Sequence, residues 1–174
     1  MTLKETLDSI GRDVVEAAQR NLGATRKIGG KTRRRVASGK LKDGLAFKNL
    51  TRYNNPVLQF GVDDQALKKY ADVIEFGRRP NSKPPPLDAI IKWMNIKGIR
   101  PRGKDGGFIK LPESAEARAD LQRYFARKIA KSIGKKGIVG IKYYTEALET
   151  VLEKRGPELL EAFGKEIENR LNLK

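Results

Sequence analysis

The first 22 residues have a helical pattern of apolar positions with polar residues between them. The apolar positions of this stripe are Leu3, Leu7, Ile10, Val14 and Ala18. Thr2, followed three positions later by Glu5, predicts a capping box at the start of the helix, and Gly23 is a typical helix stop. The sequence therefore predicts an N-terminal helix over residues 1–22.

A strand pattern follows after a basic segment. Residues 24–37 are rich in glycine and in basic residues and have no periodicity, so we expect a loop there. Alternating apolar positions then predict half-buried strands at Leu45, Phe47, Leu58, Phe60 and Val62. Between them, Tyr53-Asn54-Asn55-Pro56 is typical of a turn. Residues 38–76 thus combine a short antiparallel sheet with a helix.

Helical spacing returns in the middle of the chain. One stripe consists of Ala66, Tyr70, Val73 and Ile74. Gly77 is placed to end that helix in a left-handed conformation. A shorter stripe, ending near Lys97-Gly98, consists of Leu87, Ile90, Ile91 and Met94. It lies within residues 77–113, an insert rich in proline, glycine and basic residues.

The C-terminal part, residues 114–174, is predicted to be helical. Ser114 is a typical N-cap for a helix that we expect to stop at Gly134. A last helix is expected from about Ala147, with an interruption at Gly156-Pro157. The predicted fold is α+β: a short antiparallel β-sheet flanked by several α-helices, in a single domain over residues 1–174.

Charge changes this picture, because the chain has a formal net charge of +16. Residues 23–54 carry ten Lys or Arg against the single Asp43, and residues 122–142 carry seven and no acid. Such an excess indicates an anionic partner: nucleic acid, an acidic protein face or an anionic membrane. The densest segment is residues 26–35, whose basic residues are Arg26, Lys27, Lys31, Arg33, Arg34 and Arg35. We interpret it as an electrostatic arm for DNA or an acidic neighbour, with a solvated loop as the alternative.

The residue types that are missing limit the chemistry. With no Cys and no His, the chain has no disulfides, no thiol nucleophile, no imidazole base and no zinc ligands of these types. No phosphate-binding loop motif and no paired-carboxylate motif is present. We therefore expect no enzymatic activity, no cofactor and no metal. No apolar run is long enough to span a membrane, and the first residues lack the apolar core of a secretion signal, so we expect synthesis in the cytoplasm.

Three short segments resemble the tail-component family of long-tailed bacteriophages, the neck or tail-completion proteins of the lambdoid gene-product-ten-like group. The central segment, residues 70–77, resembles the family's Tyr-Ala-x-x-x-Glu-Phe-Gly motif. Residues 38–45 resemble an upstream Thr-Gly-Arg-Leu element of the family. Residues 124–148 resemble the family's closing pattern of a helix, a turn and an aromatic residue that opens the last helix. The insert 84–112 departs from shorter members. The residues that carry the resemblance are Ser38, Gly39, Lys40, Leu41, Tyr70, Ala71, Glu75, Phe76, Gly77, Ala126, Arg127, Ile129, Gly137 and Tyr143.

The resemblance implies a structural protein of the virion that forms a homo-oligomeric ring at the neck, where it completes the tail and joins it to the head. Expected partners are neck, connector, tail-terminator or tail-tube proteins, with non-specific contact to packaged DNA and no membrane. The alternative is a cytoplasmic protein that binds duplex nucleic acid without sequence specificity through basic loops. We also expect Tyr70, Val73, Ile74 and Phe76 to be buried against the sheet, and Glu75 to pair with a nearby Arg or Lys.

Overall fold

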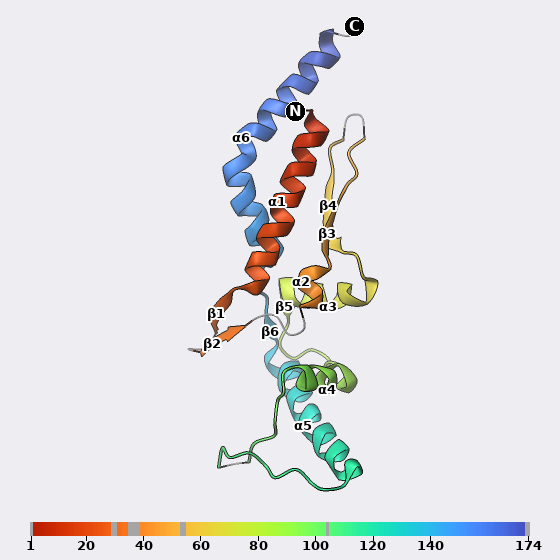
Figure 1. Ribbon diagram of the computed structural model, residues 1–174, viewed down its shortest axis with the longest axis vertical. Coiled ribbons are helices and arrows are strands. Elements are labelled where there is room, and N and C mark those ends of the chain that lie inside the picture. Colours follow the sequence, from red (N-terminus) through yellow and green to blue (C-terminus); the bar gives the residue numbers. More distant parts are fainter. Residues whose placement is uncertain (1, 29–30, 35–38, 53–54, 104, 173–174) are drawn as a thin grey trace. The chain divides into compact units, whose positions relative to one another are not determined.

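The computed structural model describes residues 2–28, 31–34, 39–52, 55–103 and 105–172 (Figure 1). Its contacts divide the chain into two compact units. Unit 1 consists of Met1–Glu75 and Ile141–Lys174, and unit 2 of Phe76–Gly140. We expected one domain, and the structure gives these two units within it. The α+β class is confirmed: the described residues form six helices and three two-stranded antiparallel ladders, and the C-terminal part is helical.

Helix α1, Leu3–Gly23, begins with the predicted capping box. The Thr2 Oγ1 atom accepts a hydrogen bond from the Glu5 backbone N–H at 3.3 Å, and Glu5 Oε2 accepts one from the Thr2 N–H at 2.8 Å. The predicted apolar stripe is buried, with Ile10, Val14 and Ala18 almost fully inaccessible to solvent. Local sequence signals thus determine the start, the end and the buried face of this helix.

Helix α6, Tyr143–Asn172, lies along α1 (Figure 1). The expected interruption at Gly156-Pro157 is wrong, because the helix continues through Pro157. Buried side chains on both sides of this point, Val151 and Ala162, pack α6 against the rest of unit 1. We infer that this packing outweighs the backbone hydrogen bond that proline cannot donate.

Arg155 ties α6 to α1 beside that proline. Its Nη1 atom donates to Ser9 Oγ at 2.9 Å and to the Asp13 carboxylate, and its Nη2 atom donates to Glu158 Oε1 at 2.7 Å. The hydrogen bonds that Arg155 donates to Glu158, and then the one to Asp13, raise the pKa of the guanidinium above its ordinary value. The same ion pair lowers the pKa of Glu158.

The predicted hairpin also packs on α1. Strands β3, Leu45–Asn49, and β4, Leu58–Val62, pair antiparallel with Phe47 opposite Phe60. The Phe47 ring lies so close to Gly11 that a Cβ atom there would be 2.3 Å from its Cε2 atom. Any larger residue at this position of α1 would force the Phe47 ring to move. The short helix α2, Lys40–Asp43, precedes β3, and α3, Gln65–Phe76, follows β4.

The predicted basic loop over residues 24–37 is wrong where the structure describes it. Strands β1, Thr25–Ile28, and β2, Lys31–Arg34, form an antiparallel ladder in which Arg26 is the partner of Arg33. Two four-residue runs separated by Gly29-Gly30 are a hairpin signal, which the high charge of the segment obscured. Residues 29, 30 and 35–37 lie outside the described residues.

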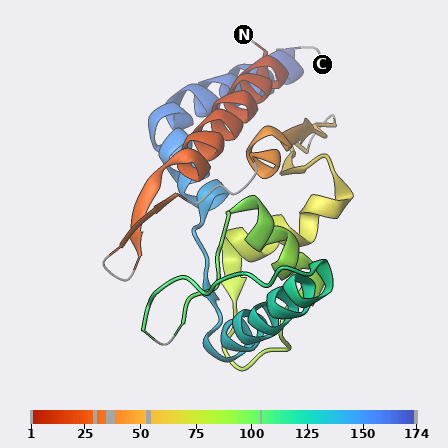
Figure 2. The ribbon, with the colours of Figure 1, turned by 60° about the horizontal axis from the view of Figure 1, so that its bottom comes forward.

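Unit 2 consists mainly of two helices that lie against each other, α4, Leu87–Ile96, and α5, Ala115–Lys136 (Figure 2). Its core consists of Ile90, Met94, Ala126 and Ala130. The predicted start of α5 is confirmed, because Ser114 Oγ accepts from the Ala117 N–H at 3.2 Å. The short strands β5, Gly77–Arg78, and β6, Ile138–Val139, form the third ladder.

The predicted stop of α5 at Gly134 is wrong. The helix continues to Lys136 and ends at Gly137, whose φ of +73° is left-handed. Gly134 is instead a position of close approach, since a Cβ atom there would lie 2.9 Å from the Ser82 carbonyl oxygen. The Gly134 carbonyl accepts from the Ser82 N–H at 2.9 Å. The proline-rich segment therefore satisfies a carbonyl near the end of α5.

We expect Ile10→Ala to lower the free energy of unfolding by about 2–5 kcal/mol, because Ile10 is 1% exposed in the core and its truncation leaves a cavity. The matched control is Ile167→Ala on α6, where the side chain is 56% exposed and the cost is within about 0.5 kcal/mol. Denaturant unfolding measures both. Equal destabilisation of the two variants would contradict the packing of α1.

Candidate functional site

The carboxylate of Glu75 lies buried at the N-terminus of α6. Glu75 is 5% exposed, and its Oε2 atom accepts from the Tyr144 backbone N–H at 2.9 Å. Its Oε1 atom accepts from the Thr145 N–H at 3.0 Å and from Thr145 Oγ1 at 2.6 Å. Both oxygens of one carboxylate thus bind the first turn of a helix that begins 68 residues later in the sequence.

The start of α6 explains why an outside acceptor is needed. The first N–H groups of a helix have no partner within the helix, and they carry the positive end of its dipole. The Lys142 carbonyl accepts the first helical hydrogen bond, from Glu146, but a lysine side chain has no acceptor for the next free N–H groups. Glu75 of α3 supplies both the acceptors and the negative charge.

Backbone hydrogen bonds fix the same junction. The Ile74 carbonyl accepts from the Ile141 N–H at 2.9 Å, and the Glu75 carbonyl accepts from the Lys142 N–H at 3.1 Å. Lys142 has a φ of +50°, which is uncommon for a residue with a side chain. We call Ile74, Glu75 and residues 141–145 the Glu75 junction.

Two tyrosines extend the Glu75 junction into the core of unit 1. Tyr143 is 1% exposed, and burial, followed by the nearby Glu75 carboxylate, raises its pKa. Burial raises the pKa of Tyr144 to about 12. The Tyr144 hydroxyl donates to the carbonyls of Ala46, at 3.1 Å, and Gly61, at 2.9 Å, on the two strands of the β3–β4 hairpin. α6 is thereby tied to both α3 and the sheet.

These contacts correct two expectations about the central motif. Glu75 is buried as the sequence suggested, but its partners are N–H groups and a hydroxyl rather than an Arg or Lys. Tyr70 is 41% exposed and Phe76 is 77% exposed, so their predicted burial is wrong, and Val73 is only partly buried. Ile74 is also partly buried but packs against the core as expected, and Ala71 of α3 is buried in it. A stripe at helical spacing identifies a face, but not how much of it a neighbour covers.

The upstream motif element is only partly described, because Ser38 lies outside the described residues. Gly39 has a φ of +80° and precedes α2. Lys40 is exposed, whereas Leu41 is buried in the same core as Ala71 and Tyr143. The structure therefore brings together one core residue from each of three motif segments that are distant in sequence.

The other motif residues lie in unit 2. Gly77 has a φ of +81°, and a Cβ atom there would lie 2.4 Å from the Ile138 carbonyl oxygen. A Cβ atom on Gly137 would lie 2.3 Å from the Arg78 carbonyl oxygen. Both glycines thus permit the close approach of the β5 and β6 segments. In α5, Ala126 is fully buried and Ile129 partly buried, while Arg127 is exposed.

The predicted electrostatic arm lies on the β1–β2 hairpin, except for Arg35, which lies outside the described residues. The ladder makes Lys27 the partner of Thr32, and Ile28 the partner of Lys31. Arg34 is the partner of Thr25. Residues 25–28 and 31–34 contain no acid, so neither strand carries a carboxylate of its own to balance the charge.

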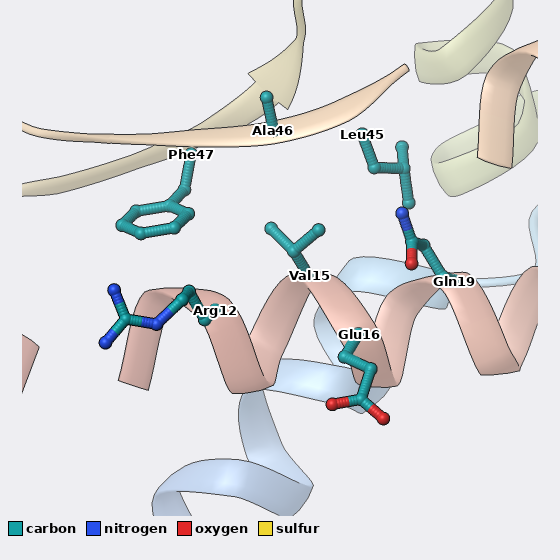
Figure 3. Close-up of a pocket in the computed structure, with 7 residues that line it drawn as sticks. All are labelled: Arg12, Val15, Glu16, Gln19, Leu45, Ala46 and Phe47. Atoms are coloured by element: carbon teal, nitrogen blue, oxygen red, sulfur yellow. The ribbon is translucent and has the colours of Figure 1, made fainter. Parts of the chain in front are cut away.

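A groove in unit 1, of about 460 Å³, lies between α1 and strand β3 (Figure 3). Phe47 and Val15 point into the space between the two elements, and Glu16 points away from it. Gln19 Nε2 donates to the Lys42 carbonyl at 3.1 Å at one end. No pair of acid and base or of nucleophile and base converges on the residues that line it, so the groove does not resemble a catalytic site.

Within the part of the chain that the structure describes, no group of three or more acidic side chains is placed to hold a metal ion. In the same residues, no helix is both long and apolar enough to cross a membrane. Comparisons of the chain with protein-family models, with curated proteins and with solved structures find no match.

Thr145 and Tyr144 are the residues that our sequence analysis missed. A helix start with lysine in place of an acceptor at residue 142, followed three positions later by a threonine, signals a cap supplied from elsewhere. That signal does not identify the residue whose side chain accepts these hydrogen bonds. Only the fold brings Glu75 to it.

We expect Glu75→Gln to lower the free energy of unfolding by about 1–3 kcal/mol. The substitution keeps the size of the side chain, but it removes the charge and places an NH₂ group against a backbone N–H. The control is Glu149→Gln, the same substitution at an exposed position of α6, with an effect within about 0.5 kcal/mol. Identical denaturation midpoints for the two variants would show that the cap is unimportant.

Gly77→Ala should destabilise the protein by more than about 1 kcal/mol, because its φ is left-handed and the new Cβ would meet backbone atoms at 2.4 and 2.5 Å. Gly164→Ala, the same substitution in open space on α6, should stabilise it by up to about 1 kcal/mol. Thermal unfolding followed by circular dichroism distinguishes them. If Gly77→Ala leaves the melting temperature unchanged, the β5 and β6 segments do not approach each other as the structure shows.

Proposed function

We propose that this protein is a structural component of a tailed-phage particle, which assembles with copies of itself into a ring at the neck and completes the head-proximal end of the tail. One observation carries the proposal: Phe76 belongs to the motif on which the family resemblance rests, yet its side chain is 77% exposed. A large apolar side chain that the chain's own core does not use is suited to a contact with a neighbour.

Other exposed apolar residues lie beside Phe76 in the chain or in the same ladder. Val139 of β6, 84% exposed, is the ladder partner of Gly77, and Ile138 is 36% exposed. A ladder with two residues in each strand leaves backbone groups at its edges that a neighbouring chain can pair with. In a closed ring the same contact repeats between all copies. We therefore assign Phe76, Ile138 and Val139 to the interface between copies.

The resemblance and the Glu75 junction support this proposal from another direction. Leu41, Ala71 and Tyr143, from three motif segments, meet in one core, and Glu75 joins two of those segments. The shared residues thus maintain a scaffold. They do not form a set of catalytic groups, which agrees with a structural role rather than an enzymatic one.

The second candidate function is sequence-independent binding of duplex nucleic acid by a cytoplasmic protein. The observation that favours it is the β1–β2 hairpin, where Arg26 and Arg33 are cross-strand partners. Strands 25–28 and 31–34 contain basic residues and no acid, so a polyanion is a suitable partner. In a neck ring, the same hairpin would serve as an arm toward DNA or an acidic neighbour. Capsid, portal and tail genes on either side of this gene would favour the ring, and a host regulatory locus would favour the alternative.

We expect the purified protein to form a closed oligomer of one defined mass, and Phe76→Ser with Val139→Ser to reduce it to monomers. Light scattering after size-exclusion chromatography measures the mass. The control, Phe108→Ser with Leu111→Ser, also replaces exposed apolar residues of unit 2 and should leave the oligomer intact. An unmodified protein that stays monomeric at every concentration contradicts the proposal, and an oligomer that survives the Phe76 and Val139 substitutions contradicts the assigned interface.

A further inference from the structure

The exposed side of α5 carries basic residues on one helical face. Arg127, Lys128, Lys131 and Lys135 follow the spacing that places residues on the same side of a helix, and all four are exposed. The opposite side, with Ala126 and Ala130, is buried against α4. We call these four basic residues, together with Tyr124, the α5 basic face.

The order of charges on α5 differs from that on the other long helices. On α1 and α6, charged residues four positions apart form ion pairs of opposite sign: Glu16 with Arg20, Glu161 with Lys165, and Glu166 with Arg170. On α5, Arg127, Lys131 and Lys135 stand four positions apart with the same sign, an arrangement that destabilises a helix. Among the described residues, none of the ion pairs involves the α5 basic face.

Because these like charges repel one another, the face as a whole does not stabilise the fold, and its charges are suited to binding a partner instead. Lys135 stabilises the end of α5, since cations there interact favourably with the helix dipole. That explanation does not extend to Arg127 and Lys128, which lie more than two turns before the end at Lys136. The whole of unit 2 shows the same excess: 16 Lys and Arg against 5 Asp and Glu give it +11 of the chain's +16.

Tyr124 gives the face a rigid element. Its ring is 50% exposed, and the Lys128 ammonium lies 4.4 Å from the ring centroid. A cation held over an aromatic ring loses less freedom when it binds an anion. The Tyr124 ring in turn contacts Phe125 edge to face, with the centroids 5.4 Å apart.

We propose that the α5 basic face binds the phosphate backbone of duplex nucleic acid without reading its sequence. From Arg127 to Lys135 the face is about 12 Å long, and duplex DNA carries one charge per roughly 1.7 Å of axis, so phosphates lie within reach in any register. Exposed cations that form no ion pair with a carboxylate in the described part of the chain suit such contacts, which position a protein on DNA but carry no sequence information.

The neighbouring surface disfavours a membrane as the partner. A helix that binds at a membrane surface inserts an apolar face among the lipids, whereas the apolar face of α5 is covered by α4. An acidic protein would need carboxylates placed at matching positions, while a duplex supplies a continuous row of charges. The inference deepens the second candidate function, duplex binding, and assigns it to α5 rather than to the β1–β2 hairpin. It stands apart from the ring proposal, because it concerns the isolated chain and a different set of residues.

The test is the binding of a fluorescein-labelled 24-base-pair duplex of random sequence, measured by anisotropy over a series of salt concentrations. The test variant is Arg127→Gln, Lys131→Gln and Lys135→Gln together. The control, Lys68→Gln, Lys69→Gln and Lys154→Gln, removes the same charge at exposed positions of unit 1. A third variant, Arg26→Gln, Lys27→Gln and Arg33→Gln, removes it from the β1–β2 hairpin.

The α5 variant should bind at least about tenfold more weakly than the control, and its slope of log affinity against log salt should fall by about 2.7, or about 0.9 for each lost phosphate contact. Its melting temperature should stay close to that of the unmodified protein, because the removal of like-charge repulsion offsets the lost interaction of Lys135 with the helix dipole. If the triple variant does not fold, Lys131→Gln alone should reduce the slope by about 0.9.

Five results would overturn the proposal, the first three of which concern duplex binding by the protein and its variants. The first would be that the unmodified protein fails to bind the duplex at low salt. The second would be that the α5 variant binds as tightly as the control, and the third that only the hairpin variant loses affinity. Displacement of the duplex by polyglutamate as readily as by unlabelled duplex would assign the face to an acidic protein instead. Binding to vesicles with anionic lipids but not to the duplex would assign it to a membrane. If the protein is monomeric but binds the duplex as expected, the ring proposal is contradicted and this inference still stands.

Discussion

The N-terminus of α6, which has no capping side chain in its own local sequence, is the constraint on which unit 1 depends. Its first N–H groups need acceptors, and the local sequence supplies a lysine there instead of a serine, threonine or aspartate. Glu75 meets that need from α3, and in doing so it brings the end of one helix to the start of another. The buried carboxylate is tolerated because three donors and a helix dipole compensate its loss of water. The cap and the burial of Glu75 thus require each other.

What could be predicted from the sequence follows from the range of each interaction. The capping box of α1, the Ser114 cap and the strands around Phe47 and Phe60 depend on residues a few positions apart, and all are confirmed. The partner of Glu75 depends on a contact across about 70 residues, which periodicity cannot reveal. Pro157 shows the opposite failure: a correct local rule is overridden by packing on both sides of the proline. The exposure of Phe76 was missed for the same reason as the partner of Glu75.

Charge is organised differently in the two units. In unit 1, Arg155 binds Glu158 and Asp13, and α6 carries further pairs of opposite sign. In unit 2, which carries most of the net charge, α5 repeats cations at the same helical spacing. The helices of unit 1 thus pair their charges within the unit, whereas most of the net positive charge of the chain lies in unit 2.

Amide hydrogen exchange of the unmodified protein, followed residue by residue by NMR, tests the Glu75 junction most directly. First-turn amides of a helix usually exchange fast, because they have no partner within the helix. We predict that the Tyr144 and Thr145 amides are protected as strongly as amides in the middle of α6, since Glu75 accepts from both at 2.9 and 3.0 Å. Exchange of these two amides at the rate of an unprotected chain, while the middle of α6 stays protected, would contradict the account.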